Sequence, residues 1–464
     1  MKRILTLTFG LLSAVAFAQK NGAITESMLQ QIKQQNPPTA TDRALRNALA
    51  ANGINDLTKR ADKAPVDGNF TYRVPSNGIT DQQSSGRCWL FTGLNVMRAR
   101  MIKDYKLGEF TLSQSFLSFY DQLEKSNLFL QCVIDYAKEP IDSRQNTWLF
   151  EHPLSDGGTF SGVQDLVMKY GVVPAEVFPE SYNANNTSKM AEIISLKLRQ
   201  YGLELRDMVS KGKSATDLQK RKTTMLGEVY HILQICLGTP VEKFVWTLRT
   251  ADGKAVSTAE YTPKQFYQEF VGKDLKNDYV MLMNDPTRPY YKLYAVDLDR
   301  HTYDGRNWTY INLPMNEIKA MAVKSLKDTT MMYMSCDVGK FLDKKTGVLD
   351  VDNYDYASLF NTTFPMNKAE RIQTHASASS HAMTLMAVGL DATGKTTKWM
   401  VENSWGPTYG YKGHLIMTDK WLDEYLFRLV VDKKYVDAKT LDILNQKPTL
   451  LPVATSSPRS SLCF

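Results

Sequence analysis

The chain contains 464 residues, of which 43% are hydrophobic and 23% are charged. This composition excludes a mostly disordered, collagen-like or low-complexity protein, and the length allows one large elaborated domain or two to three lobes. The 56 Lys and Arg residues and 49 Asp and Glu residues give a net charge of +7, too small a bias over this length to indicate nucleic-acid binding. The five cysteines cannot all pair with one another, so at least one is free or pairs outside the chain, if any disulfide forms.

Residues 1–18 are typical of a secretory signal peptide. Lys2 and Arg3 precede an apolar run, and Ala16-Phe17-Ala18 forms a small-residue cleavage site before Gln19. The alternative, a membrane anchor, needs about 20 apolar residues, and this run is shorter. We therefore expect the mature protein to be exported to the periplasm or the extracellular space, with no membrane span after signal removal.

The first half of the mature chain is predicted to be mainly helical. Residues 20–65 carry apolar side chains at roughly helical spacing, with an interruption at Pro37-Pro38. Residues 89–106 repeat apolar side chains with a helical period, residues 110–140 are rich in aromatic side chains, and residues 188–237 alternate apolar and basic residues. Each of these segments is expected to form helix.

The second half of the chain changes to strands. Residues 244–248, followed by Ala251-Asp252-Gly253, predict a strand and a hairpin turn, and residues 315–325 are expected to be helical. Further strands are predicted at residues 331–334, 384–390, 399–401, 413–417 and 426–431. A chain that is helical first and β later indicates an α+β protein of two lobes.

One cysteine stands where a nucleophile is expected. Cys88 follows a turn at Gly86 and begins an apolar helix, and the positive end of a helix dipole favours thiolate over thiol. Because the thiolate is the reactive form, this position suits covalent catalysis. Gln82 lies six residues earlier and is expected to donate a hydrogen bond to a developing oxyanion. The alternatives are a buried structural thiol and a solvated loop amide.

A histidine and an asparagine complete a possible catalytic triad. His381 precedes a strand-like run, and Asn403 follows 22 residues later. An asparagine oxygen can accept one imidazole N–H and fix the ring, so that the other nitrogen faces the sulfur. The alternatives are a core histidine and an asparagine that only forms a turn.

The other histidines and cysteines are predicted to have structural or surface roles. The histidines are His152, His231, His301, His375 and His414. Cys132, Cys236 and Cys336 lie in apolar surroundings and are expected to be buried free thiols, whereas Cys463, in the Pro- and Ser-rich tail, is expected to react with outside partners. No Cys or His spacing resembles a zinc site, and no phosphate-binding loop appears, so neither a metal nor a cofactor is predicted.

Short strings around these residues resemble known peptidases. Cys88-Trp89, His381-Ala382 and Asn403-Ser404-Trp405-Gly406 are similar to papain-type cysteine peptidases. The Cys88-to-His381 interval is 293 residues (381 − 88), whereas about 130 to 150 are expected of papain-like chains, so a large insertion must separate them. This interval and the longer strings resemble the bleomycin hydrolase/aminopeptidase C family. The strings are residues 84–91, 156–158, 169–174, 178–182, 284–289, 336–340 and 401–406, within a match from about residue 25 to 445.

The resemblance implies a fold, an activity and a set of site residues. The implied fold is α+β, a papain-like two-lobe core with a large, mainly helical insertion between the catalytic Cys and His. The implied roles are Cys88 as nucleophile, His381 as base, Asn403 as its orienting residue and Gln82 as oxyanion donor. Substrate contacts are implied for Gly157, Gly158 and Trp405. The resemblance also implies peptide substrates and a homohexamer, and nucleic acid is not an expected partner.

The expected domain organisation combines this resemblance with the predicted signal peptide. It comprises a signal peptide (1–18), an N-terminal helical segment (19–70), a helical lobe with the nucleophile (71–190), the insertion (191–325), a β lobe with His381 and Asn403 (326–440) and a C-terminal arm (441–464).

The chain departs from this family at its two ends. Family members have a C-terminal arm whose carboxylate meets the free amino group of the substrate, and the ending 452–464 does not look like that arm. The export signal also differs from the best-known members, which are intracellular. We expect an exported cysteine-type aminopeptidase. The alternatives are a thiol endopeptidase with an open cleft and a catalytically silent peptide-binding assembly protein on the same fold.

Overall fold

The computed structural model describes residues 22–452. The predicted signal peptide and cleavage site, Cys463 and the end of the C-terminal arm lie outside the described residues. The chain divides into two compact units, residues 1–59 and residues 60–464, and each is described by itself.

The described part of the first unit consists of three short helices. They are α1 (Glu26–Gln35), α2 (Ala40–Leu49) and α3 (Ile54–Thr58). The hydroxyl of Thr25 caps α1, and Thr39 forms a reciprocal capping box with Asp42 at the start of α2. Helix α1 ends before Pro37-Pro38 and α2 begins after it, as predicted. Proline has no backbone N–H to donate within a helix.

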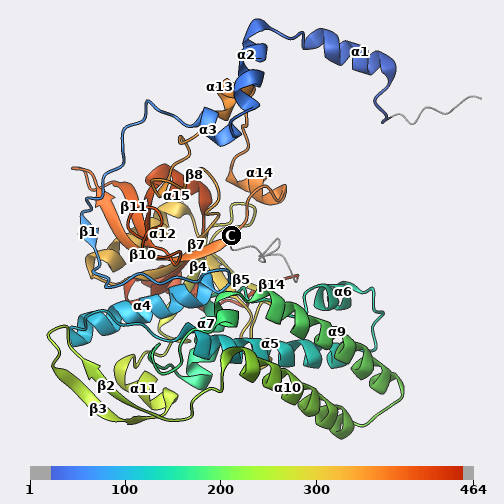
Figure 1. Cartoon of the computed structure of the whole chain (residues 1–464), viewed down its shortest axis with the longest axis vertical. Helices are drawn as coiled ribbons and strands as arrows, with labels where there is room; N and C mark the ends of the chain where they lie inside the picture. The colour runs from blue at the N-terminus through green and yellow to red at the C-terminus, as the bar shows by residue number, and fades with distance from the viewer. Residues whose placement is uncertain (1–21, 453–464) are drawn as a thin grey trace, which may run out of the picture. The chain divides into compact units, whose positions relative to one another are not determined.

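The helices of the second unit gather mainly beneath its sheet in the view of Figure 1. Those in the first part of the unit are α4 (Cys88–Tyr105), α5 (Gln114–Asp135), α6 (Arg144–Glu151), α7 (Phe160–Tyr170), α8 (Tyr182–Asn185), α9 (Ser188–Ser210), α10 (Ala215–Leu237) and α11 (Pro263–Phe270). Those in the later part are α12 (Met315–Lys327), α13 (Tyr356–Phe360), α14 (Lys368–Gln373), α15 (Asp419–Tyr425) and α16 (Ala438–Asp442).

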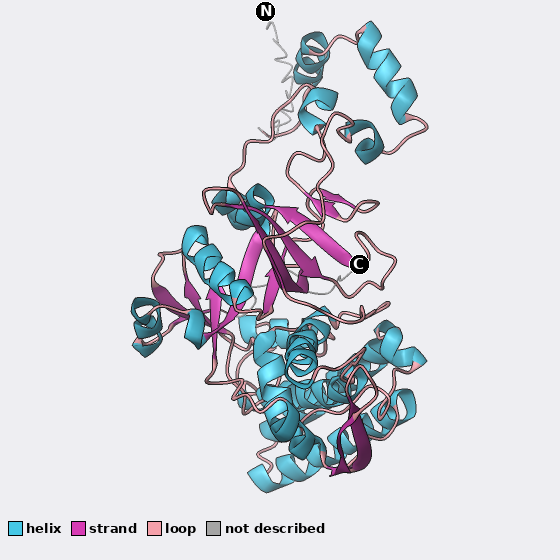
Figure 2. Ribbon diagram, turned by 90° about the vertical axis from the view of Figure 1, so that its left-hand side faces the viewer, coloured by secondary structure: helices cyan, strands magenta, loops and turns pink. Residues whose placement is uncertain are grey.

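A twelve-stranded mixed sheet forms the other layer of this unit (Figure 2). Its order is β14-β5-β6-β4-β13-β7-β10-β11-β12-β9-β8, and β1 pairs with β10. The strands are β1 (Tyr72–Arg73), β4 (Tyr279–Met283), β5 (Lys292–Val296), β6 (Thr309–Asn312), β7 (Met332–Cys336), β8 (Leu342–Asp343), β9 (Val348–Leu349), β10 (His381–Leu390), β11 (Thr396–Glu402), β12 (His414–Thr418), β13 (Leu426–Asp432) and β14 (Thr449–Leu451). A separate hairpin pairs β2 (Phe244–Arg249) with β3 (Ala255–Tyr261).

The helix that begins at Cys88 is buried on almost every side. Leu90, Leu94 and Met101 of α4 are at most 1% exposed, and the helix packs against β10 and against α7 and α5. Full burial of such side chains stabilises a fold by about 1.5–3 kcal/mol each. The start of α4 is therefore held rigidly between the sheet and the helical layer.

The predicted elements agree with the structure in type and order. The helices predicted at 89–106, 110–140 and 315–325 and the hairpin after residue 244 are confirmed. The interval predicted as the insertion carries more than helices, because β4, β5 and β6 join the same sheet as β10. The predicted domain boundaries stay a prediction. Among the described residues, no helix has both the length and the apolar character that crossing a membrane requires.

Candidate active site

Cys88 is the first residue of α4, as the sequence predicts. Its side chain is buried at 6% exposure, and the carbonyl of Arg87 accepts the amides of Leu90 and Phe91. Just before the helix, the Gly86 amide donates to the Asp156 carboxylate at 2.6 Å. Cys88 therefore stands at the N-terminal end of an ordered helix, which carries the positive end of the helix dipole.

His381 and Asn403 come together at the ends of two neighbouring strands. β10 begins at His381, and Asn403 directly follows β11, which pairs with β10 in antiparallel register. His381 Nε2 lies 2.8 Å from Asn403 Oδ1, which also accepts the Ser404 amide at 2.8 Å. Because an amide oxygen only accepts, Nε2 carries the proton in this pair. His381 Nδ1 is buried and has no hydrogen-bond partner among residues 22–452, so it is the nitrogen available for chemistry.

Trp405 covers the histidine ring. The rings of Trp405 and His381 stack at a centroid distance of 4.6 Å and an angle of 27°, and Tyr409 packs edge-on against Trp405 at 4.8 Å. This stacking limits rotation of the imidazole. The contact with substrate predicted for Trp405 stays a prediction.

Gln82 is joined to the segment that follows Asn403. Its backbone amide donates to the Ser404 carbonyl at 2.9 Å, and its Oε1 accepts the Ser404 hydroxyl at 2.7 Å. Nε2 donates to the Ser85 carbonyl at 2.6 Å, and because a carbonyl only accepts, this contact fixes which amide atom is nitrogen. A primary amide has two N–H groups, so one remains for an oxyanion.

The loop of residues 155–158, between α6 and α7, lies against the start of α4. The indole of Trp89 donates to the Asp156 carbonyl at 2.8 Å, in addition to the Gly86 contact. A Cβ on Gly158 would lie 2.2 Å from the His301 ring and 2.8 Å from Trp89. Packing thus requires glycine at 158, and the substrate contacts predicted for Gly157 and Gly158 stay a prediction.

Two ion pairs adjoin the site and were not predicted. Arg87, 1% exposed and next to Cys88, lies 2.9 Å from the Glu180 carboxylate. Arg98 of α4 pairs with Glu402, next to Asn403. Two features of the sequence could have indicated these pairs. Glu402 is a charged residue in an otherwise apolar strand, and Arg87 and Glu180 both lie in strings that carry the family resemblance.

The other described cysteines contrast with Cys88 in their surroundings. Cys132 and Cys336 are buried and Cys236 is partly buried, and none of the three forms a disulfide within the described residues. Burial raises the pKa of Cys132 to about 12 and raises the pKa of Cys336 well above its usual value. These thiols therefore stay protonated and unreactive near neutral pH. In the part of the chain that the structure describes, no three His, Cys, Asp or Glu side chains group as metal ligands.

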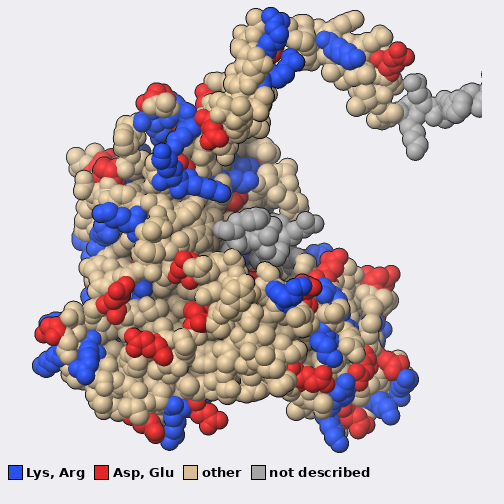
Figure 3. Space-filling model, viewed as in Figure 1, with Lys and Arg blue, Asp and Glu red and all other residues tan. Residues whose placement is uncertain are grey.

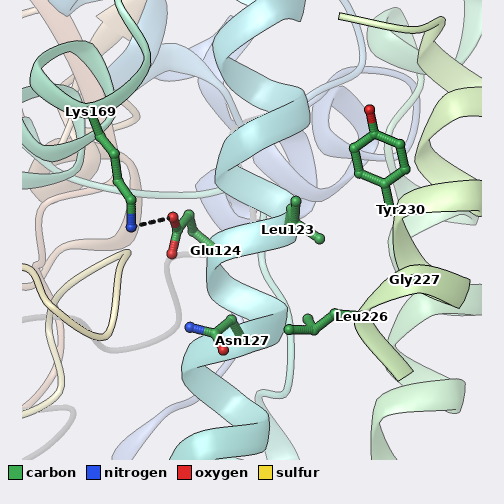
Figure 4. Close-up of a pocket in the computed structure, with 7 residues that line it drawn as sticks. All are labelled: Leu123, Glu124, Asn127, Lys169, Leu226, Gly227 and Tyr230. Carbon is green, nitrogen blue, oxygen red and sulfur yellow. Dashed lines mark ion pairs between the residues drawn. The ribbon is translucent and has the colours of Figure 1, made fainter. Parts of the chain in front are cut away.

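A surface cavity of about 380 Å³, separate from the candidate active site, lies between α5, α10 and the end of α7 (Figure 4). The Lys169–Glu124 ion pair, 2.7 Å long, closes one side of it. Its lining contains none of the predicted site residues and consists of Leu123, Glu124, Asn127, Lys169, Leu226, Gly227 and Tyr230.

A buried cysteine at a helix start, together with a His–Asn pair at a sheet end, defines a papain-like cysteine peptidase. The model of the Peptidase C1-like family matches residues 23–456. The bleomycin hydrolase of Homo sapiens is 41% identical over 406 residues, which cover 85% of this chain and 89% of that protein. The aminopeptidase C of Lactobacillus delbrueckii subsp. lactis is 36% identical over 393 residues, which cover 84% and 87%.

A solved structure supports the same assignment. PepW from Lactobacillus rhamnosis matches with a TM-score of 0.89 and 37% identity, covering 93% of this chain and 98% of that chain. The chain belongs to the Peptidase C1-like family. The predicted resemblance to bleomycin hydrolase and aminopeptidase C, the α+β papain-like fold class and the prediction of a cysteine-type peptidase are confirmed.

Proposed function

We propose that this chain is an exported cysteine-type aminopeptidase that hydrolyses N-terminal residues from peptides through Cys88, His381 and Asn403. The observation that carries the proposal is the His381–Asn403 hydrogen bond of 2.8 Å, which leaves Nδ1 available. The aminopeptidase assignment is supported by relatives named aminopeptidase C that are 35–36% identical to this chain.

The mechanism proceeds by acylation and deacylation. The Cys88 thiolate attacks the scissile carbonyl, and the resulting oxyanion accepts hydrogen bonds from the second N–H of Gln82 and the Cys88 backbone amide. His381, protonated at Nδ1, gives that proton to the leaving amine as the C–N bond breaks. The neutral ring then removes a proton from water, and the hydroxide releases the acyl group from sulfur. Asn403 holds the ring throughout, and no metal or cofactor takes part.

The alternative within the same chemistry is an endopeptidase. Its motivation is the ending 452–464, which does not look like the arm that restricts the family to free amino termini. Substrates with free and blocked amino termini separate the two activities. A catalytically silent peptide-binding assembly would cleave neither.

The localisation and the assembly are also part of the proposal. The apolar run and the cleavage site before Gln19 support export, and mass spectrometry of the secreted or periplasmic chain should find Gln19 as its first residue. The homohexamer is proposed from the family resemblance and is tested by light scattering. Lys and Arg are interspersed with Asp and Glu on the face shown in Figure 3, which offers little support for nucleic acid as a partner.

The deciding experiment compares free-amine and N-blocked fluorogenic peptides under reducing conditions. An aminopeptidase cleaves only the first, and Cys88→Ala should abolish that cleavage. Cys132→Ala is the matched control because it removes another buried thiol far along α5 and should leave the rate unchanged. Cleavage of the blocked peptide would overturn the exopeptidase assignment, and equal rates for Cys88→Ala and wild type would overturn the nucleophile.

A further inference from the structure

A cluster of buried and partly buried polar side chains lies against Trp89, the tryptophan that follows the nucleophile. Asp121 and Lys125 come from α5, and His301 comes from the connection between β5 and β6. Asp121 is 1% exposed and His301 is 3% exposed. None of the three takes part in the mechanism above. Ionised groups are seldom fully buried unless they are paired, so their partners indicate what they do.

The ammonium of Lys125 donates hydrogen bonds to backbone carbonyls of the 155–158 loop. Nζ donates to the Ser155 carbonyl at 2.8 Å, to the Gly157 carbonyl at 2.7 Å and to Asp121 Oδ2 at 2.7 Å. These contacts use all three N–H groups of the ammonium. Nζ also lies 5.4 Å from the ring centroid of Trp89, over its face. One cation thus joins the loop to the residue beside Cys88.

Asp121 contacts both of the other side chains in the cluster. Its Oδ1 lies 2.5 Å from His301 Nδ1, while Oδ2 accepts from Lys125. Burial, the largest single influence, raises the pKa of Asp121, but its interactions with Lys125 and His301 together bring it below its usual value. The aspartate therefore stays ionised and holds both partners in place.

His301 fills the space that two glycines leave beside Trp89. Its ring packs edge-on against Trp89, with a centroid distance of 4.5 Å and an angle of 61°. A Cβ at Gly158 or at Gly162 would lie 2.2 Å or 2.4 Å from the His301 ring. The His301 ring therefore packs against the 155–158 loop, the first turn of α7 and Trp89.

We propose that Lys125, held by Asp121 and His301, is a positioning residue that sets the backbone of the 155–158 loop to bind the peptide substrate beside Cys88. The inference rests on the proposed function, because it assigns peptide binding to this loop. An apolar residue would pack against Trp89 equally well, but it could not hold two carbonyl oxygens of an otherwise irregular loop. Without the ammonium, the Ser155 carbonyl would keep only its longer contact with Gln122 Nε2, at 3.3 Å, and the Gly157 carbonyl would lose its contact of 2.7 Å, so the loop would be held less firmly.

The test replaces Lys125 with methionine, which has a similar length but no charge and no donor. We expect KM for the free-amine peptide to rise about tenfold, as for loss of a hydrogen bond to a charged group, with kcat changed less than KM. Alkylation of Cys88 by iodoacetamide, a small reagent that does not use the loop, should keep its wild-type rate. Lys125→Arg, which retains charge and donors, should restore part of the KM.

Lys319→Met is the matched control. Lys319 is a partly buried, ion-paired lysine in the same unit, 2.9 Å from Asp419 and 2.7 Å from Asp423. Its loss should lower stability without changing KM. An unchanged KM in Lys125→Met, or an equal rise in Lys319→Met, would overturn the proposal. Should Lys125→Met fail to fold, Asp121→Asn, which keeps an acceptor but removes the counter-charge, should still raise KM.

A second measurement does not depend on activity. Hydrogen exchange of the amides of residues 155–158 should be faster in Lys125→Met than in wild type and Lys319→Met. If the wild-type protein cleaves neither peptide, the proposed function fails, and exchange still decides whether Lys125 holds the loop. Equal exchange in all three proteins would overturn the positioning role.

Discussion

His381 Nε2 donates to Asn403 Oδ1 across 2.8 Å, and the two residues stand 22 positions apart at the ends of adjacent strands. The asparagine is in turn fixed by the Ser404 amide at 2.8 Å. The pair determines which nitrogen of the imidazole carries the proton, so the orientation of the candidate base depends on the ends of these two strands and not on the histidine alone.

Asn403→Ala removes the acceptor that orients His381. We expect kcat for the free-amine peptide to fall about 10- to 100-fold, the range expected when a hydrogen bond to a charged imidazolium is lost. Asn353→Ala is the matched control, because Asn353 is also a buried asparagine and donates to two backbone carbonyls, at 2.7 Å and 2.9 Å. Both variants should lose stability, and only Asn403→Ala should lose kcat. Equal kcat values would contradict the orienting role.

Glu402 and Arg98 form a fully buried pair that fastens α4 to the end of β11. Removing one partner of such a pair costs about 3–5 kcal/mol, because the other charge is left uncompensated. Glu402→Gln should therefore lower the free energy of unfolding by that amount in urea titrations. Replacing both residues with apolar ones, Arg98→Met with Glu402→Leu, should cost less than the sum of the single changes. Additive losses would show that the two side chains do not interact.

Lys368, the first residue of α14, gives the protein a predictable pH dependence of stability. Burial lowers its pKa to about 7, although Nζ donates to Asn284 Oδ1 and to the Leu426 carbonyl, both at 2.6 Å. Between about pH 7 and 10.5 the unfolded chain binds this proton and the folded chain does not. Stability from this group therefore rises with pH across that window, by up to about 1.4 kcal/mol per pH unit.

Lys368→Met should remove that rise. The difference in unfolding free energy between wild type and variant is measured at pH 7, 8.5 and 10, and wild type should gain relative to the variant as pH increases. The lost hydrogen bonds add an offset that does not depend on pH. A difference that stays constant over the three values would mean that Lys368 keeps its ordinary pKa in the folded protein.

Alanine should lower the stability of the protein at Gly158 and raise it at Gly227. A Cβ at Gly158 would meet the His301 ring at 2.2 Å, whereas nothing lies within 4 Å of one at Gly227, in the middle of α10. Gly158→Ala should cost about 1–3 kcal/mol through overpacking and raise KM. Gly227→Ala should stabilise by about 0.5–1 kcal/mol, because alanine favours helix over glycine. Thermal unfolding of the two variants checks both signs.

The sequence predicted most helices and strands well, because the spacing of apolar residues along a short segment reflects the geometry of that segment. The apolar period after residue 88 follows from helix geometry, and α4 runs from Cys88 to Tyr105 against a predicted 89–106. β10 begins at His381, three residues before the predicted 384. The contribution of β4, β5 and β6 to the main sheet was missed, because strand pairing joins segments that are far apart in the chain.

Local strings also identified some residues of the candidate site and missed others. Cys88 and Gln82 were found from one short string, and His381 and Asn403 from two further strings. His301, which the sequence predicts to be structural or surface, is buried against Trp89 and bonded to Asp121, 180 residues away. No local pattern marks such a residue, because its role depends on three segments that meet only in the folded chain.

The sequence by itself determined that one of five cysteines stands at a helix start, where its sulfur is suited to be a nucleophile, and which family the chain belongs to. These conclusions rest on neighbouring residues, whose geometry the backbone sets directly. Only the tertiary structure decided which nitrogen of His381 is available and which lysine contacts the 155–158 loop. Those features depend on contacts between distant segments, whose partners are chosen by packing and by the need to satisfy buried polar groups.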